Sequence, residues 1–422
     1  MNRTRIIPAL CAAVVLAWTV PAGADSVSDW NAIASQTVAT AMPPRAAPVF
    51  FLDLATVHAA IHDAVQAYEG KYEPYALEIS GATGAIDAAV AKAALDVLSN
   101  RFPPQAAALL ITYTSYLNGK GINPVTDPGV AIGAAAASAV IAKRSTDGSF
   151  PNPPPVNNGG TDPGEWRPTT SYLPGPPLSG SPMAVPWFGQ VTPFTLTSPT
   201  QYRPGPPPAI NTGRYTRDYN ETKRLGSDVN SERTQEQTDL AVFFTMNFGT
   251  QWELALRDIV AAHVPDIADS ARLFALTNMA ITDNVITAWD CKVTYPLWRP
   301  VTAIQEGDND GNPHTEGDVN WRPFINTPNY PDSCSGANSV TGAATEILNQ
   351  LFGEHFEFVM TSSNLLAIPP TRTYTISSIR QDVEDVRVYQ GIHFRDADIQ
   401  GRQNGIKVGK WAAKHALQPV GD

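Results

Sequence analysis

Three basic side chains and an imidazole are spaced along the chain in a way that could hold a tetrahedral oxyanion. Lys292, Arg299 and Pro300 form the pattern K-x6-R-P, and Arg387 precedes His393 by six residues. Arginine offers a planar pair of donors to two oxygens of one anion, and lysine adds a compact charge. These residues therefore predict a binding site for a four-oxygen anion.

A hydroxyl and a glycine stand between the two basic motifs. Ser335 directly precedes a run over 336–352, which begins with Gly336 and whose apolar residues have helical spacing. A glycine at a helix start lets backbone amides approach an anion, and the helix dipole favours negative charge at that end. We therefore expect Ser335 and the Gly336 amide to complete the anion site.

Helices must position these motifs, because helical apolar spacing recurs along the chain and alternating strand patterns are few. Residues 151–208 hold 17 of the 37 prolines, which excludes a run of regular helices there. We interpret this stretch as an ordered cover anchored by Trp166, Trp187 and Phe188, with a floppy linker as the alternative. The predicted fold is all-α, a helical bundle with long Pro-rich connections.

The helical spacing and the proline content divide the chain into regions. Helices are expected over 28–68 in two pieces, 83–120 as a hairpin, 129–144, 234–245, 250–262, 267–292, 336–352, 376–390 and 397–415, with a loop over 305–333. The expected regions are a signal peptide over 1–24, an N-terminal helical region over 25–150, a Pro-rich cover segment over 151–214 and a helical region with all the anion motifs over 215–422.

The first 24 residues have the features of a secretory signal. Arg3 and Arg5 precede an apolar stretch, and small residues end at Ala24, where cleavage is expected. The apolar stretch is short for a transmembrane helix, and no later segment has 18 unbroken apolar residues. We expect a secreted or periplasmic protein that does not span a membrane.

Net charge and cysteine content indicate which binding partners and which cysteine chemistry the protein could have. The formal net charge of −11 argues against nonspecific nucleic-acid binding, so any basic pocket must be local. Beyond the signal, Cys291 directly precedes Lys292 and Cys334 directly precedes Ser335. If these segments meet around one anion, the thiols could form a disulfide; otherwise they pack as buried free thiols.

Taken together, the motifs resemble those of the vanadium-dependent haloperoxidase and phosphatidic acid phosphatase type 2 superfamily. Its pattern is K-x6-R-P, then P-S-G-H, then S-R-x5-H-x3-D. The resemblance is closest to the bacterial haloperoxidase-related branch, through the segments 57–65, 289–290, 298–304, 310–313 and 391–395. It covers most of residues 45–415 and implies a helical-bundle fold of that type.

The resemblance also implies roles for the motif residues. Lys292, Arg299 and Arg387 would bind the equatorial oxygens of vanadate or phosphate, together with Ser335 and the Gly336 amide. His393 would be the axial ligand of vanadate in a haloperoxidase, or the nucleophile in a phosphatase. One site can serve both, because vanadate and a phosphoryl transition state have the same shape and similar charge.

The chain departs from the family pattern at catalytic positions. Ala337 stands where the family has the His of P-S-G-H, and loss of a positioned acid or base typically costs ~10²–10⁴-fold in rate. Asn338, Cys334 and His314 are candidates to replace it. Ala397 stands where an Asp is expected after His393, so its neighbours Asp396 and Asp398 are candidates to orient His393 Nδ1.

Three functions follow as hypotheses. The first is an exported haloperoxidase-like enzyme with a vanadate cofactor, which uses hydrogen peroxide, a halide and a small organic substrate. The second is an acid phosphatase acting on phosphomonoesters through His393. The third is an oxyanion-binding homologue with altered or lost turnover. A homodimer is compatible with each of them.

Two weaker patterns suggest metal ions, and one residue has two interpretations. His58 and His62 have the i, i+4 spacing of helical metal ligands, but packing of both in the bundle is the favoured interpretation. Asp308, Asp310 and Asn312 resemble part of a calcium loop without its terminal Glu. Trp298 is expected to pack the wall of the site rather than flank a halide.

Overall fold

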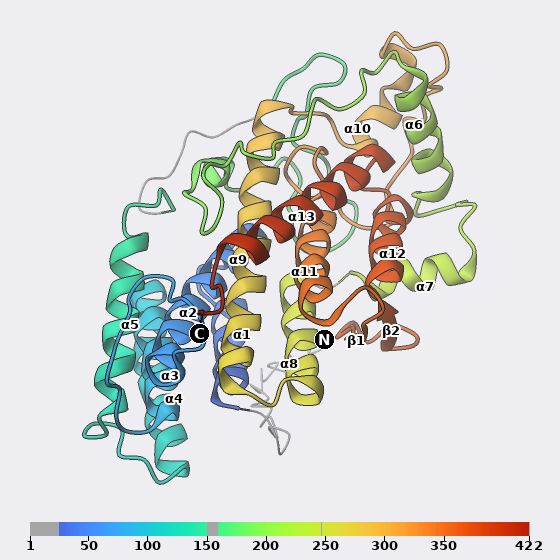
Figure 1. The fold of residues 1–422 in the computed structure, drawn as a ribbon. Helices are drawn as coiled ribbons and strands as arrows, with labels where there is room; N and C mark the ends of the chain where they lie inside the picture. Colours follow the sequence, from blue (N-terminus) through green and yellow to red (C-terminus); the bar gives the residue numbers. More distant parts are fainter. Residues whose placement is uncertain (1–24, 150–158, 246, 422) are drawn as a thin grey trace, which may run out of the picture.

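The structure, a computed structural model, describes residues 25–149, 159–245 and 247–421. The predicted signal peptide over 1–24 lies outside these residues. Helices dominate the described chain, as the sequence predicts, and bundle around one long helix (Figure 1).

The N-terminal region consists of helices whose ends coincide with prolines and turns. They are α1 (Ser26–Ala39), α2 (Ala47–Glu69), α3 (Ile86–Arg101), the short η1 (Pro103–Gln105), α4 (Ala106–Gly119) and α5 (Gly129–Arg144). Alanines and glycines let α3 and α5 approach closely. A Cβ at Gly133 would lie 2.2 Å from the Ala89 carbonyl oxygen, so a larger residue would push the two helices apart.

The Pro-rich segment contains a short helix, η2 (Pro186–Gln190), and is otherwise irregular where it is described. Trp166 and Phe188 are fully buried, and Trp166 N donates to the Pro296 carbonyl. The carboxylate of Asp283 accepts the amides of Phe194 and Thr195 at 2.6 and 2.7 Å. These contacts support the ordered-cover interpretation for the described part of the segment.

The remaining helices carry the predicted anion motifs. They are α6 (Gly213–Leu225), α7 (Gln235–Phe243), α8 (Phe248–His263), α9 (Ile267–Thr294), α10 (Pro300–Gln305), η3 (Gly307–Asn309), α11 (Gly336–Phe352), α12 (Ile376–Tyr389) and α13 (Arg395–His415). A small antiparallel hairpin, formed by β1 (Glu357–Thr361) and β2 (Thr371–Thr375), was not predicted; in it Phe358 lies opposite Tyr374.

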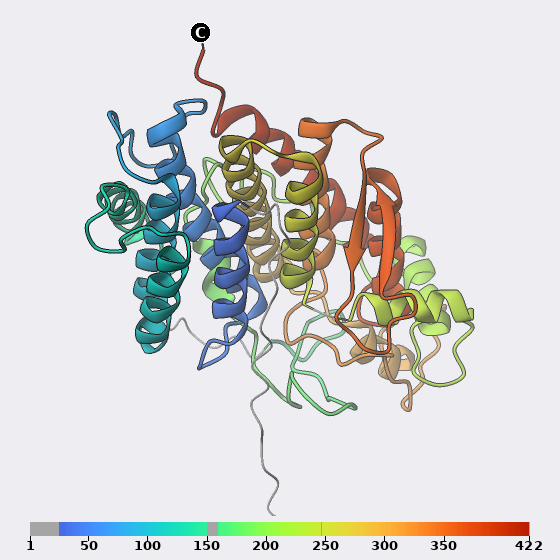
Figure 2. The same ribbon diagram turned by 90° about the horizontal axis from the view of Figure 1, so that it is seen from below.

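Helix α9 forms the centre of the bundle, because it packs against α2, α11 and α13 and is buried along most of its length. Helices α3, α4 and α5 lie on one side of it, and α11, α12 and the hairpin lie on the other (Figures 1 and 2). Gly401, Gly405 and Gly409 on α13 allow close contact with α11: a Cβ at Gly405 would lie 2.7 Å from Ala343 N.

One described helix, α2, is long and apolar enough to cross a membrane by length and composition. Its apolar window is completely buried inside the protein, which is what the core helix of a bundle requires.

Candidate oxyanion site

The motif residues come from separate elements and are brought together at one end of α9. Lys292 lies in the last turn of α9, Arg299 precedes α10, and Ser335 is the N-cap of α11. Arg387 lies in the last turn of α12, and His393 lies in the turn before α13. We call Lys292, Arg299, Ser335, Gly336, Arg387 and His393 the basic cluster.

The ring of Tyr330 is shared between the cations of the basic cluster. Lys292 Nζ lies 5.0 Å from the ring centroid, and Arg299 Cζ lies 4.9 Å from it. Arg387 and Tyr330 line the same cavity. The charges of Lys292, Arg299 and Arg387 all lower the pKa of His393, so the cations are close enough to act on one imidazole.

Lys292 is fully buried, and backbone carbonyls solvate its ammonium group. Its Nζ donates to the carbonyl oxygens of Pro331 at 2.7 Å and Asp332 at 3.0 Å. Burial, with a further contribution from the charge of Arg299, lowers the pKa of Lys292 to about 7. The charge of this lysine therefore changes near neutral pH.

Arg299 ties together two loops of the site. Its Nε donates to the Tyr330 carbonyl at 2.7 Å, and its Nη1 donates to the Ile392 carbonyl at 2.6 Å. Within the described residues, its buried Nη2 has no hydrogen-bond partner. A guanidinium fixed at two corners with a third donor unused is suited to binding an anion.

Asp332 is a buried carboxyl group of the site that the sequence analysis missed. Its Oδ1 lies 2.8 Å from His393 Nδ1 and 3.6 Å from Arg299 Nη1. Burial raises the pKa of Asp332 to about 7, although the charges of Arg299 and Lys292 oppose the shift. Asp332 therefore supplies the carboxyl partner of His393.

This arrangement corrects the prediction that Asp396 or Asp398 orients His393. Asp396 pairs with Arg214 and accepts from Gln400 Nε2 at 2.6 Å. Asp398 instead accepts from Asn338 Nδ2 at 2.8 Å. Both carboxyl groups therefore have partners other than the imidazole.

His393 is buried, and its surroundings hold it neutral. Burial, followed by the charges of Arg299, Lys292 and Arg387, lowers its pKa well below the ordinary value. Arg299 Nη1 lies 3.2 Å from Nε2. An ionised Asp332 Oδ1 that lies 2.8 Å from Nδ1 favours the tautomer with its proton on Nδ1, and the Nε2 lone pair then faces the Arg299 donor.

The N-terminus of α11 supplies the Ser335 hydroxyl and the Gly336 backbone amide. Ser335 Oγ caps the helix by accepting from Asn338 N at 3.5 Å, and Asn338 Nδ2 lies 3.3 Å from the same oxygen. Burial raises the pKa of Asp398 well above its ordinary value, while a hydrogen bond with Ser335 opposes the shift. These contacts fix the Ser335 side chain at the helix end.

A cavity of about 190 Å³ opens beside this helix end. Aromatic side chains line it together with Gly336, Ala337 and Arg387; they are Phe51, Phe244, Phe248, Trp289 and Tyr330. The Arg387 guanidinium lies 5.4 Å from the Phe248 ring, and its buried Nε has no hydrogen-bond partner within the described chain. The missing family histidine would stand at position 337, on the wall of this cavity.

The three candidates to replace that histidine have other surroundings. The Asn338 amide contacts Asp398 and Ser335, and Cys334 Sγ lies 2.7 Å from Cys291 Sγ. His314 is exposed and does not line the cavity. The structure therefore assigns none of these three side chains to the cavity wall.

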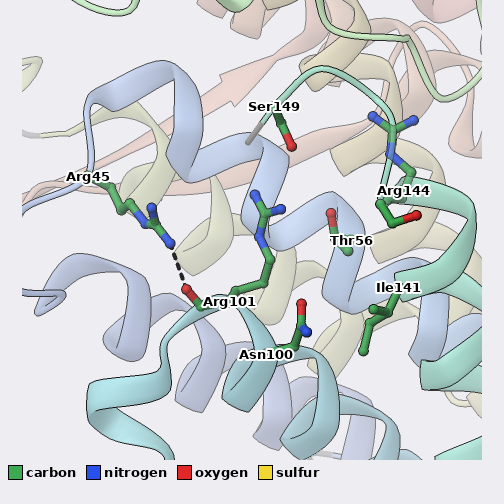
Figure 3. A pocket seen from close by; sticks show the side chains of 8 residues that line it. Arg45, Thr56, Asn100, Arg101, Ile141, Arg144 and Ser149 are labelled. Carbon is green, nitrogen blue, oxygen red and sulfur yellow. Dashed lines mark hydrogen bonds between the residues drawn. The ribbon is translucent and has the colours of Figure 1, made fainter. Parts of the chain in front are cut away.

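A second cavity, of about 370 Å³, is also rich in arginine (Figure 3). Arg45 and Arg101 both pair with the buried carboxylate of Asp53, at 3.4 and 2.6 Å, and Arg144 pairs with Asp147 at 2.7 Å. No residue of the basic cluster lines this cavity. Its arginines serve the packing of α2, α3 and α5.

The weaker metal patterns have structural explanations. His58 stacks on Phe274 with ring centroids 4.9 Å apart, and His62 Nε2 lies 3.0 Å from the Glu73 carbonyl. Asp308 and Asp310 accept hydrogen bonds from their own loop. Across residues 25–149, 159–245 and 247–421, no group of three His, Cys, Asp or Glu side chains could hold a metal ion.

The position of Trp298 agrees with the wall-packing prediction. Its side chain is fully buried, and Nε1 donates to the Tyr215 hydroxyl at 2.9 Å. It belongs to a small hydrophobic cluster with Tyr219 and Phe394, which supports the turn that carries His393.

Comparison with known proteins finds similarity in the C-terminal part. Residues 272–422 match the model of the second helical-bundle domain of vanadium chloroperoxidase. A 95-residue stretch is 34% identical to the vanadium chloroperoxidase of Curvularia inaequalis. That stretch spans 20% of this chain and only 15% of the fungal protein.

Solved structures extend the likeness to the whole fold. A bacterial vanadium-dependent iodoperoxidase superposes with a TM-score of 0.76 at 20% identity, over 94% of this chain and 97% of that one. The apo form of a bacterial vanadium-dependent chloroperoxidase gives a TM-score of 0.69 at 18% identity, over 87% and 92% of the two chains. Residues 272–422 are thus similar to the second helical-bundle domain of vanadium chloroperoxidase, and the described chain has the fold of these bacterial vanadium-dependent haloperoxidases.

Proposed function

We propose that this protein is a vanadate-dependent haloperoxidase-type enzyme in which Ala337 replaces a catalytic histidine on the wall of the cavity. The observation that carries the proposal is the contact between Asp332 and His393 beside Arg299, which provides a neutral, oriented imidazole next to fixed cations. The haloperoxidase-type chemistry and the dependence on vanadium, which the relatives' names describe, are both proposed for this protein.

The residues of the basic cluster are suited to a tetrahedral oxyanion. Arg299 Nη2 and Arg387 Nε are buried donors without hydrogen-bond partners among the described residues, so an anion would satisfy both. The N-terminus of α11 adds amides and a favourable dipole. The oxygens of the anion would be bound by Lys292, Arg299, Arg387, Ser335 and the Gly336 amide.

His393 would bind the anion through Nε2. With Asp332 ionised, Nε2 presents a lone pair, and a neutral imidazole is the form that ligates a metal oxide or attacks phosphorus. When bound, vanadate supplies a Lewis acid that activates peroxide toward a halide. The protein's own contribution is to orient the imidazole and to neutralise the anion's charge.

Ala337 removes the general acid or base that the family places on the cavity wall. The aromatic cavity remains open to a small organic molecule, with Arg387 at its wall. We therefore propose slow halide oxidation rather than the full rate of an intact site. We also propose that the chain is exported, because Arg3 and Arg5 precede an apolar stretch at its N-terminus.

The test compares three readouts on the purified protein without residues 1–24. Bromination of monochlorodimedone is followed with vanadate, peroxide and bromide, hydrolysis of p-nitrophenyl phosphate is measured in parallel, and vanadate binding is titrated. His393→Ala should abolish bromination, whereas the matched control His314→Ala should retain it, because His314 is exposed and outside the basic cluster.

Each outcome has a defined meaning. Bromination that depends on His393 supports the proposal. Phosphate release without bromination replaces it with the phosphatase hypothesis. Tight vanadate binding with neither reaction leaves an oxyanion-binding homologue, and no binding of vanadate at all overturns the proposed site.

A further inference from the structure

Two buried sulfur atoms meet directly beneath the basic cluster. Cys291 Sγ and Cys334 Sγ lie 2.7 Å apart, although the residues are 43 positions apart in the chain. Both side chains are fully buried. A disulfide bond joins sulfurs at about 2.0 Å, so a small approach of the two side chains is enough to form it.

The environment of the two sulfurs favours a covalent bond between them over other roles. Ser333 Oγ lies 3.9 Å and Gln400 Oε1 lies 3.8 Å from Cys334 Sγ, so these polar neighbours make only weak contacts. In the described part of the chain, no third His, Cys, Asp or Glu joins the pair to form a metal site. Two thiols with no other ligand partner are positioned to react with each other.

The connection links two parts of the anion site. Cys291 precedes Lys292 at the end of α9, and Cys334 precedes Ser335 at the start of α11. We propose that Cys291 and Cys334 form a disulfide that clamps the lysine and serine segments of the basic cluster together. The bond itself does not depend on the proposed function, whereas its effect on anion affinity rests on that function.

The oxidation is a thiol–disulfide exchange with a small disulfide such as oxidised glutathione. The thiolate of one cysteine attacks a sulfur of the oxidant, forming a mixed disulfide and releasing one small thiol. The second protein thiolate then attacks the protein-bound sulfur of that mixed disulfide and expels the second small thiol. Two electrons and two protons pass from the protein to the oxidant. Because both sulfurs are buried in the folded chain, the exchange takes place during folding.

The bond is tested on the full chain produced in an oxidising compartment and purified without reductant. The protein is unfolded in guanidinium with N-ethylmaleimide and digested with trypsin. Cleavage after Lys292 places the two cysteines on separate peptides. We expect a cross-linked peptide pair that disappears after phosphine reduction. Unlinked, maleimide-labelled Cys291 and Cys334 peptides in the unreduced sample would overturn the proposal.

Single variants provide the matched controls. Cys291→Ser and Cys334→Ser should each leave one maleimide-labelled thiol and no cross-linked pair. A pair that persists in either variant would show that the cross-link joins other cysteines. Since Cys11 lies in the expected signal, its peptide is monitored separately.

The clamping effect has its own readout, with sulfate as the probe because sulfate does not react with thiols. Wild-type protein that is unfolded, reduced and refolded in reductant should bind sulfate with a Kd about threefold higher or more, because a loosened site must be ordered on binding. Neither serine variant should respond to reduction. An unchanged Kd in a reduced wild-type protein would refute the clamp while the peptide result stands. Failure of sulfate to bind in both redox states would count against the anion site instead.

Discussion

Asp332→Asn should tighten anion binding above neutral pH and leave it unchanged below. The substitution keeps the shape of the side chain and an oxygen that can accept from His393 Nδ1. It removes only the ability to ionise. Because burial raises the pKa of Asp332 to about 7, the wild-type carboxyl group is mostly neutral at pH 6 and mostly charged at pH 8.5.

The expected change in the Kd for the anion can be calculated from the ion pair between Asp332 and Arg299. The two charged groups are 3.6 Å apart, which corresponds to roughly 4–5 kcal/mol of attraction at an effective dielectric constant of about 20. A bound anion competes with Asp332 for this guanidinium. If about a third of the attraction is lost on binding, the cost is ~1.4 kcal/mol, or about tenfold in Kd.

The assay is calorimetric titration with sulfate, whose charge is constant over this range. The ratio of wild-type to variant Kd should rise from about 1 at pH 6 to about 10 at pH 8.5. The pKa of Lys292, which burial lowers to about 7, is raised by the charge of Asp332, so Lys292 titrates at lower pH in the variant; the two proteins are therefore compared at pH 6 and 8.5, where its charge is nearly the same in both. In each protein alone, affinity should fall as pH rises through 7.

Asp310→Asn serves as the matched control, because that carboxyl group is held by Asn312 N and Thr315 within its own loop. The ratio of the wild-type Kd to the Asp310→Asn Kd for sulfate should stay near 1 at every pH. A flat ratio for Asp332→Asn, in a variant with wild-type thermal stability, would refute the placement of an ionisable carboxyl group against the anion.

Three further outcomes follow from the same geometry. Ala337→His should raise whichever turnover is present by about tenfold or more, measured as bromination or phosphate release, because it restores a proton donor on the cavity wall; no gain in a folded variant would mean that Ala337 is not simply a missing acid. Arg299→Lys should weaken sulfate binding by about tenfold although the charge is kept, since one ammonium cannot bridge the Tyr330 and Ile392 carbonyls and still reach the anion; an unchanged Kd would contradict that assignment. Gly405→Ala should destabilise the protein by about 1–3 kcal/mol, seen as a lower thermal midpoint, because its Cβ would lie 2.7 Å from Ala343 N; an unchanged midpoint would refute close packing of α13 on α11.

Most helices were predictable because their apolar residues repeat with the period of the α-helix. The ends of α5 and α11 are those expected from the sequence, and the two pieces expected over 28–68 are α1 and α2, with Pro43-Pro44 between them. The β1–β2 hairpin was missed because strands of five residues carry too little alternation to stand out. Short elements of this kind depend on tertiary contacts such as Phe358 opposite Tyr374.

The anion site was predictable only in part. Motif spacing predicted its cations, its serine and its imidazole, because each belongs to a recognisable local pattern. Asp332 carries no such signal: it lies in an irregular loop, and it becomes the partner of His393 only when that loop folds against the turn before α13. Counting residues from His393 selected Asp396 and Asp398, which lie on the first turn of α13 and have partners other than the imidazole.

The carbonyl groups around Lys292 and Arg299 bear on whether the protein needs a bound anion in order to fold. Four peptide oxygens, from Tyr330, Pro331, Asp332 and Ile392, already replace the water that these two cations lose on burial. The chain can therefore reach its native state before any inorganic ion is available. If the proposed oxyanion binds, its binding need not be coupled to folding.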